Sequence, residues 1–64
     1  MENFTRRLNN LIEELNLTDL QIAATCKVSL GTVRRWKAGE SAPHPFGQES
    51  VFRTLETLRR VTND

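Results

Sequence analysis

The chain has 64 residues, a net charge of +1 and 38% apolar residues, enough for one domain, residues 1–64, with one small core. A single cysteine, Cys26, and a single histidine, His44, exclude an intramolecular disulfide and cannot supply the usual three or four ligands of a metal site. No apolar run approaches the roughly 20 residues of a transmembrane span, and no secretory signal is recognised, so we expect a cytoplasmic protein without a membrane partner. We expect neither an enzyme, because the core is too small to enclose a substrate pocket of several hundred Å³, nor a cofactor or small-molecule ligand.

The predicted fold is all-α, a compact bundle of about four helices. Apolar residues at positions 4, 8, 11, 12 and 15 form one stripe of a first helix, which ends at Asn16-Leu17. Thr18 and Gln21 have the spacing of a capping box, which predicts the start of a second helix over about 18–26.

A third helix is predicted from Leu30 to about Ala38. Ser29 is its N-cap candidate, and Gly39 is well placed as the left-handed residue that follows a helix. Two short helices joined by about three residues form a helix-turn-helix, here over about 18–38.

Two prolines in residues 40–45 predict an irregular connection, after which a last helix is expected over about 47–60. Its inward-facing residues are expected to be Val51, Phe52, Leu55 and Leu58. Its exposed ion pairs are expected, from their spacing of four, to be Glu49–Arg53 and Glu56–Arg60. Elsewhere we expect core positions for Trp36 and Cys26, a loop position for His44, and solvated positions for Arg6 and Arg7.

The basic residues are unevenly distributed. Residues 1–26 sum to −2 and residues 40–64 to −1, whereas residues 27–39 sum to +4. That segment holds Lys27, Arg34, Arg35 and Lys37 and no acidic residue. A basic segment in an otherwise balanced chain favours a polyanionic partner; the alternative is a helix face that is merely solvated and basic.

On the third helix the two arginines share one face, which Leu30 and Lys37 border. Val33 and Trp36, three residues apart, mark the core side, and the opposite side carries Gly31, Arg34, Arg35 and Ala38. Small residues allow close approach to a groove wall, and the arginine fork pairs with guanine O6 and N7 or with phosphate. Leu30, in the first turn, is placed to meet a thymine methyl group. This composition suits a helix in the major groove of DNA.

Residues 17–39, LTDLQIAATCKVSLGTVRRWKAG, resemble the helix-turn-helix of the lambda-repressor/Cro-like (Xre-type) family. The matching features are Ala23 at the close-packed position of the first helix, Val28-Ser29 before the second, and the closing residues 36–39. The resemblance covers about 23 residues, and the flanking helices fit the family's compact bundle.

The resemblance implies a double-stranded DNA partner. It places the base contacts at Leu30, Gly31, Arg34 and Arg35. The phosphate contacts would then fall to Thr18, Gln21, Lys27, Ser29, Thr32 and Lys37. Three residues depart from the family pattern: Asp19 stands where Gln is usual, Lys27 stands where Gly is usual, and Gly31 has no side chain with which to read a base.

The function expected on this basis is that of a sequence-specific transcriptional regulator, a repressor of the small phage or mobile-element kind that acts by covering a promoter. Because one small module buries modest area on DNA, we expect a homodimer on a palindromic operator. Its interface is expected at Phe46, Phe52 and Leu55, unless the phenylalanines simply close the core. The alternatives are a protein-interaction module such as an antitoxin or adaptor, and an architectural or recombination accessory protein.

Overall fold

The computed structural model describes the backbone of residues 3–62 and the side chains of residues 3–59. Four helices follow one another: α1 (Phe4–Leu15), α2 (Asp19–Cys26), α3 (Leu30–Ala38) and α4 (Pro45–Thr62). No strand lies within residues 3–62, so the fold is all-α, as predicted. None of the helices in this range is both long enough and apolar enough to cross a membrane.

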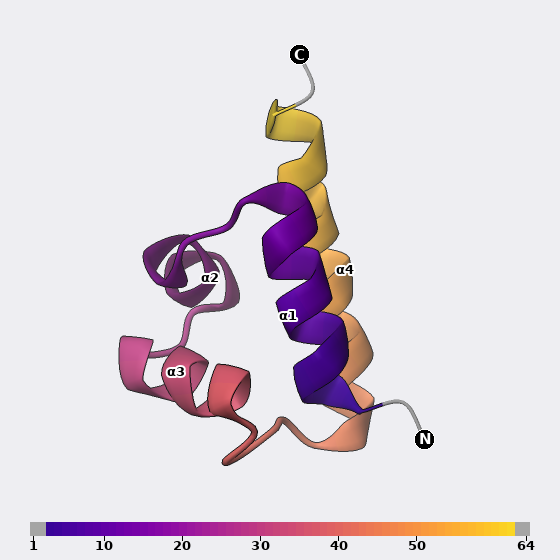
Figure 1. The fold of residues 1–64 in the computed structure, drawn as a ribbon. Coiled ribbons are helices and arrows are strands. Elements are labelled where there is room, and N and C mark those ends of the chain that lie inside the picture. The colour runs from indigo at the N-terminus through magenta and orange to yellow at the C-terminus, as the bar shows by residue number, and fades with distance from the viewer. Residues whose placement is uncertain (1–2, 63–64) are drawn as a thin grey trace.

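The helices α1 and α4 lie side by side and run in the same direction, whereas α2 and α3 lie on one side of α1 (Figure 1). Ion pairs join α1 and α4 near both ends, from Arg7 to Glu49 at 3.0 Å and from Glu14 to Arg59 at 2.9 Å. The helix α2 packs on both α3 and α4, and α3 packs on α1. The α1–α4 pair therefore forms the base on which α2 and α3 are held.

Local side-chain caps start the first three helices. The Asn3 side chain accepts a hydrogen bond from the Arg6 backbone N–H at 2.8 Å, and Ser29 Oγ accepts from the Thr32 N–H at 3.1 Å. At the start of α2 the capping box is complete, because Thr18 Oγ1 accepts from the Gln21 N–H and the Gln21 side chain accepts from the Thr18 N–H. These bonds satisfy backbone donors that the first turn of a helix leaves without a partner. The predicted starts of α2 and α3 are confirmed.

The same three helices end at a residue in the left-handed conformation. These residues are Asn16, Lys27 and Gly39, with φ of 58°, 60° and 82°. After α3 the Gly39 N–H donates to the Trp36 carbonyl at 3.2 Å, and the Glu40 N–H donates to the Arg35 carbonyl at 2.9 Å. Gly39 thus ends α3 as predicted, without the steric cost that a Cβ brings to this conformation.

The last helix begins at Pro45, two residues before the predicted start. Proline is favoured at the first helical position, because no N–H is needed there and its φ is already helical. His44 is the residue that caps the helix: its carbonyl oxygen accepts from the Gly47 N–H at 2.7 Å, and its Nδ1 accepts from the Phe46 N–H at 3.3 Å. His44 is thus in the connection before α4, as predicted, and it also organises the start of that helix.

The core is formed by apolar side chains from all four helices. Leu8, Ile22, Val33 and Leu55, one from each helix, are fully buried. Around them three aromatic rings pack together. Phe4 meets Trp36 edge-on, with centroids 5.4 Å apart, and lies 5.2 Å from Phe52. Trp36 is a core residue, as expected.

The burial of α4 corrects part of the predicted dimer interface. Phe52 is 6% exposed and Leu55 is 0% exposed, so both side chains are used inside the chain and neither presents a surface to a second copy. The alternative, in which a phenylalanine closes the core, holds for Phe52. Phe46, by contrast, is 87% exposed.

One predicted ion pair of α4 is wrong, and the other is not tested. Glu49 pairs across the helices with Arg7, and not with Arg53 on its own helix. Glu56 pairs with Arg59 at 2.8 Å, and the side chain of Arg60 lies outside the described residues. Arg7 is half-buried, because its guanidinium also lies 4.2 Å above the Phe52 ring. It is part of the α1–α4 contact and not a free cation.

Candidate nucleic-acid interface

The helix α3 separates its apolar and basic residues onto opposite faces. Val33 is fully buried and Trp36 is 6% exposed, whereas Arg34 and Arg35 are exposed. Leu30, at the start of the helix, is 37% exposed. The predicted inner and outer faces of α3 are therefore those of the structure, and both arginines are accessible to a ligand.

Side chains from α1 hold the C-terminal end of α3. The Thr5 hydroxyl donates to the Trp36 carbonyl oxygen at 3.0 Å, and Asn9 Nδ2 donates to the Lys37 carbonyl oxygen at 3.2 Å. The last carbonyl groups of a helix lack N–H donors from a following turn. The Trp36 carbonyl also accepts from the Gly39 N–H, so the Thr5 bond is its second, whereas the Asn9 side chain supplies a donor to the Lys37 carbonyl. The two side-chain bonds also fix α3 relative to α1, which gives its outer face a defined position.

The N-terminal end of α3 carries small and hydroxyl side chains. Ser29 Oγ and Thr32 Oγ1 lie 3.0 Å apart and share a hydrogen bond. A Cβ at Gly31 would lie 3.7 Å from Arg35 Nη1 and 3.9 Å from Ser29 Oγ, so the Arg35 side chain extends back over this glycine. A Cβ at position 31 would make only ordinary van der Waals contact with these atoms, so the position of the Arg35 guanidinium does not depend on a glycine here.

The first turn of α2 offers two further polar groups. The capping box uses the Thr18 oxygen and the Gln21 side-chain carbonyl as acceptors. The hydroxyl hydrogen of Thr18 and the amide NH₂ of Gln21 are donors that these bonds leave available. Both residues are exposed, so the cap is compatible with the phosphate contacts predicted for them.

Asp19, from the same turn, reaches the basic segment. Its Oδ1 accepts a hydrogen bond from Lys37 Nζ at 2.7 Å, and its Oδ2 lies 3.7 Å from Arg34 Nε. The hydrogen bond from Lys37, with the charges of Lys37 and Arg34, lowers the pKa of the Asp19 carboxyl below its ordinary value. Segment 27–39 has no acid of its own, but the fold supplies one from α2.

This contact divides the four cations of the segment into two kinds. Arg34 and Lys37 lie against Asp19, whereas Lys27 and Arg35 form no ion pair with another residue of the described part. The free cations are thus one at the turn before α3 and one in the middle of its outer face. The composition of the segment reveals its charge but not this division.

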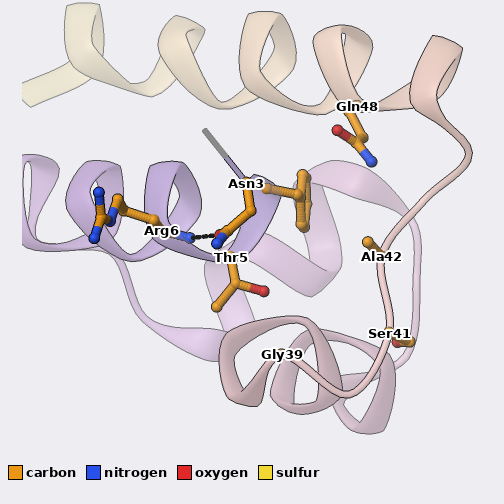
Figure 2. Close-up of a pocket in the computed structure, with 8 residues that line it drawn as sticks. Asn3, Thr5, Arg6, Gly39, Ser41, Ala42 and Gln48 are labelled. Carbon is orange, nitrogen blue, oxygen red and sulfur yellow. Dashed lines mark hydrogen bonds between the residues drawn. The ribbon is translucent and has the colours of Figure 1, made fainter. Parts of the chain in front are cut away.

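An open depression of about 740 Å³ has three boundaries: the first turn of α1, the α4 helix, and the connection that joins α3 to α4 (Figure 2). Its lining residues are Asn3, Phe4, Thr5, Arg6, Gly39, Ser41, Ala42 and Gln48. In Figure 2 the Asn3 side chain turns to the Arg6 backbone that it caps. The lining offers one ionisable side chain, that of Arg6, and no acid–base pair.

A second depression, of about 340 Å³, adjoins Cys26 between the end of α2 and the start of α4. Cys26 is half-buried against the core, and this burial raises the pKa of its thiol. Within the described residues no group of three or more His, Cys, Asp or Glu side chains comes together as a metal site would require. Neither depression gathers several ionisable side chains, whereas Asp19, Arg34 and Lys37 come together where α3 meets the first turn of α2. We therefore take this surface as the candidate site.

A scan against protein-family models, a search of curated proteins and a search of solved structures found no match to this chain.

Proposed function

We propose that the chain is a sequence-specific double-stranded DNA-binding regulator of the lambda-repressor/Cro-like kind, with α3 as its recognition helix. The observation that carries the proposal is the outer face of α3, where Arg34 and Arg35 are exposed while Val33 and Trp36 are buried. An exposed arginine pair on a helix whose other face is anchored in the core suits recognition of an ordered, charged surface.

The dimensions of α3 agree with this role. An α-helix with its side chains is about 10–12 Å in diameter, so the major groove of B-DNA, about 12 Å wide, admits it. The nine residues of α3 give it a length of about 13 Å along the groove. In this arrangement Arg35, which no described acid neutralises, is the first candidate for a bidentate contact with guanine. Arg34 and Leu30 flank it, and Gly31 allows the backbone to approach the groove closely.

The phosphate contacts are assigned to polar groups around this face. Lys27 lies at the turn before α3, and its side chain is exposed. The hydroxyl and amide groups assigned to the backbone are those of Thr18, Gln21, Ser29 and Thr32. Lys37, which the sequence also assigns to the backbone, donates to Asp19 and is not counted among these contacts. Such contacts set orientation and affinity, whereas base contacts set sequence preference.

We propose further that the regulator acts as a homodimer that covers a promoter and represses transcription in the cytoplasm. One small module buries only about 600–1,000 Å² on DNA, and two copies on a palindrome place their recognition helices one helical turn apart, about 34 Å. Of the three residues expected at the interface, only Phe46 has an exposed side chain.

The experiment that tests this function is selection of binding sites from a library of random duplexes, followed by fluorescence anisotropy with a selected and a scrambled duplex. The proposal expects an enriched palindromic sequence, binding with two chains per duplex, and a preference of at least about a thousandfold over the scrambled sequence. A library that stays random through the selection would contradict it.

A further inference from the structure

Lys37 is restrained at both its backbone and its side chain. Its carbonyl oxygen accepts from Asn9 of α1 at 3.2 Å, and its ammonium donates to Asp19 of α2 at 2.7 Å. Its side chain is 35% exposed and that of Asp19 is 28% exposed, so the pair is only partly covered. The Lys37 ammonium is therefore accessible to an anion from solvent, but it already has the Asp19 carboxylate as its partner.

The pair adjoins the face assigned to DNA. Arg34, one turn before Lys37 on the same helix, is 69% exposed in its side chain and lies 3.7 Å from the other carboxylate oxygen. A phosphate that approached this end of α3 would meet two cations with a carboxylate between them. The Lys37 ammonium has three N–H donors and gives one to Asp19, and the Asp19 carboxylate neutralises its charge. A phosphate at this ammonium would therefore compete with the Asp19 carboxylate for it and be repelled by that carboxylate.

We propose that Asp19 is an internal competitor for the DNA phosphate at Lys37, and that it sets the affinity of the α3 surface for the DNA backbone. The pair removes one cation from the surface that meets phosphate. Binding of DNA then depends more on the contacts that Arg35 and its neighbours make to bases, and less on the neutralisation of backbone phosphates. This inference rests on the proposed DNA binding, and it adds to it a residue that limits non-specific affinity.

The test measures the salt dependence of binding to a 20-base-pair duplex of random sequence, for which only backbone contacts matter. Each additional phosphate contact steepens the slope of log K against log salt by about 0.9. We expect Asp19→Asn to bind this duplex on the order of fivefold more tightly at 0.1 M salt and to steepen the slope by about one contact, since Lys37 is released.

Three further variants show whether a steeper salt slope in Asp19→Asn comes from the release of Lys37 or only from the loss of one negative charge. Glu13→Gln on α1 removes the same charge at an exposed position, and we expect it to leave the slope unchanged. In Asp19→Asn/Lys37→Met the slope should return to the wild-type value, because no ammonium is left to release. Lys37→Met alone should leave the wild-type slope unchanged, which keeps the test decisive even if Asp19→Asn does not fold.

The inference is overturned if Asp19→Asn binds with the wild-type slope, if the double variant keeps the steeper slope, or if Lys37→Met alone flattens it by about one contact. A loss of preference for a selected sequence in Asp19→Asn, without a change in slope, would overturn it too and make Asp19 a positioning residue for Arg34. A wild-type chain that binds no duplex at any salt concentration overturns the proposed function, and the inference with it.

Discussion

Asn16 and Lys27 end successive helices in the same backbone conformation, with φ, ψ of 58°, 47° and 60°, 47°. The cap N–H of each donates back into its helix, to Ile12 and to Ala23 respectively. Asparagine tolerates this left-handed region, whereas a lysine there carries a steric cost of about 1 kcal/mol. The turn that leads into α3 is therefore strained, and the turn that leads into α2 is not.

This difference predicts the effect of glycine at the two positions. Lys27→Gly should raise the free energy of unfolding by up to about 1 kcal/mol, because glycine adopts a positive φ without a Cβ clash. Asn16→Gly should change it by only a few tenths of a kcal/mol. Urea unfolding followed by circular dichroism measures both, and an equal effect at the two positions would contradict the account of strain at Lys27.

The capping box of α2 predicts a loss of stability in Thr18→Ala. The variant removes the acceptor for the Gln21 N–H, which should cost about 1 kcal/mol of unfolding free energy. Thr18→Ser is the matched control, since it retains the hydroxyl oxygen and should lie within about 0.5 kcal/mol of wild type. A melting curve of Thr18→Ala that superimposes on that of the control would show that the cap contributes nothing.

The pair between Asp19 and Lys37 predicts a titration. The carboxyl of Asp19 should titrate below its ordinary pKa of 3.8, chiefly because it accepts the hydrogen bond from Lys37. A depressed pKa in the folded state means that the pair stabilises the fold above the unfolded pKa and that this contribution is lost as the pH falls through the folded value. For a pair at the surface it amounts to about 0.2–1 kcal/mol.

Carbon chemical shifts of Asp19, followed by NMR as the pH is lowered, measure this pKa directly. In Lys37→Met the midpoint should move upward, towards 3.8, because the main cause of the shift has gone. The midpoint should not move in Lys27→Met, which removes a cation of the same segment that does not pair with Asp19. An unchanged midpoint in Lys37→Met would show that the pair does not form in solution.

The two phenylalanines of α4 predict opposite phenotypes. Phe52 is buried in the aromatic cluster, so Phe52→Ala should cost about 3–5 kcal/mol of unfolding free energy. Phe46 is 87% exposed, so Phe46→Ala should leave the stability of the single chain within about 0.5 kcal/mol of wild type. If Phe46 contributes to the proposed homodimer, the same variant should weaken self-association in analytical ultracentrifugation; an unchanged association constant would remove Phe46 from the interface.

The boundaries of α2 and α3 could be predicted because their signals are local. A cap such as Thr18 or Ser29 bonds to a backbone group three residues away, and Gly39 acts through its own φ. The predicted start of α4 is two residues too late for an equally local reason. A proline predicts a break in a helix but is also favoured at the first helical position, and histidine is not among the usual capping residues.

Contacts between helices could not be predicted in the same way. Asp19 and Lys37 are 18 residues apart, and Arg7 and Glu49 are 42 residues apart. Periodicity places each residue on a face of its own helix but does not say which face of another helix it meets. The sequence therefore does not show that Asp19 of α2 lies against the basic segment, or that Glu49 pairs with Arg7 of α1 and not with Arg53, four residues away on its own helix.

The assignment of α3 to the major groove is tested most directly by the variant Arg35→Ala. Its affinity is measured by fluorescence anisotropy at several salt concentrations, for a duplex selected by the wild-type chain and for a scrambled duplex. Arg53→Ala on α4 is the matched control, since it removes the same charge from an exposed position outside the proposed interface. We expect Arg35→Ala to lose about 1–3 kcal/mol of binding free energy on the selected duplex, with a smaller loss on the scrambled one, and Arg53→Ala to retain the wild-type preference. Binding of Arg35→Ala with wild-type affinity and preference would contradict the assignment of α3 to the major groove.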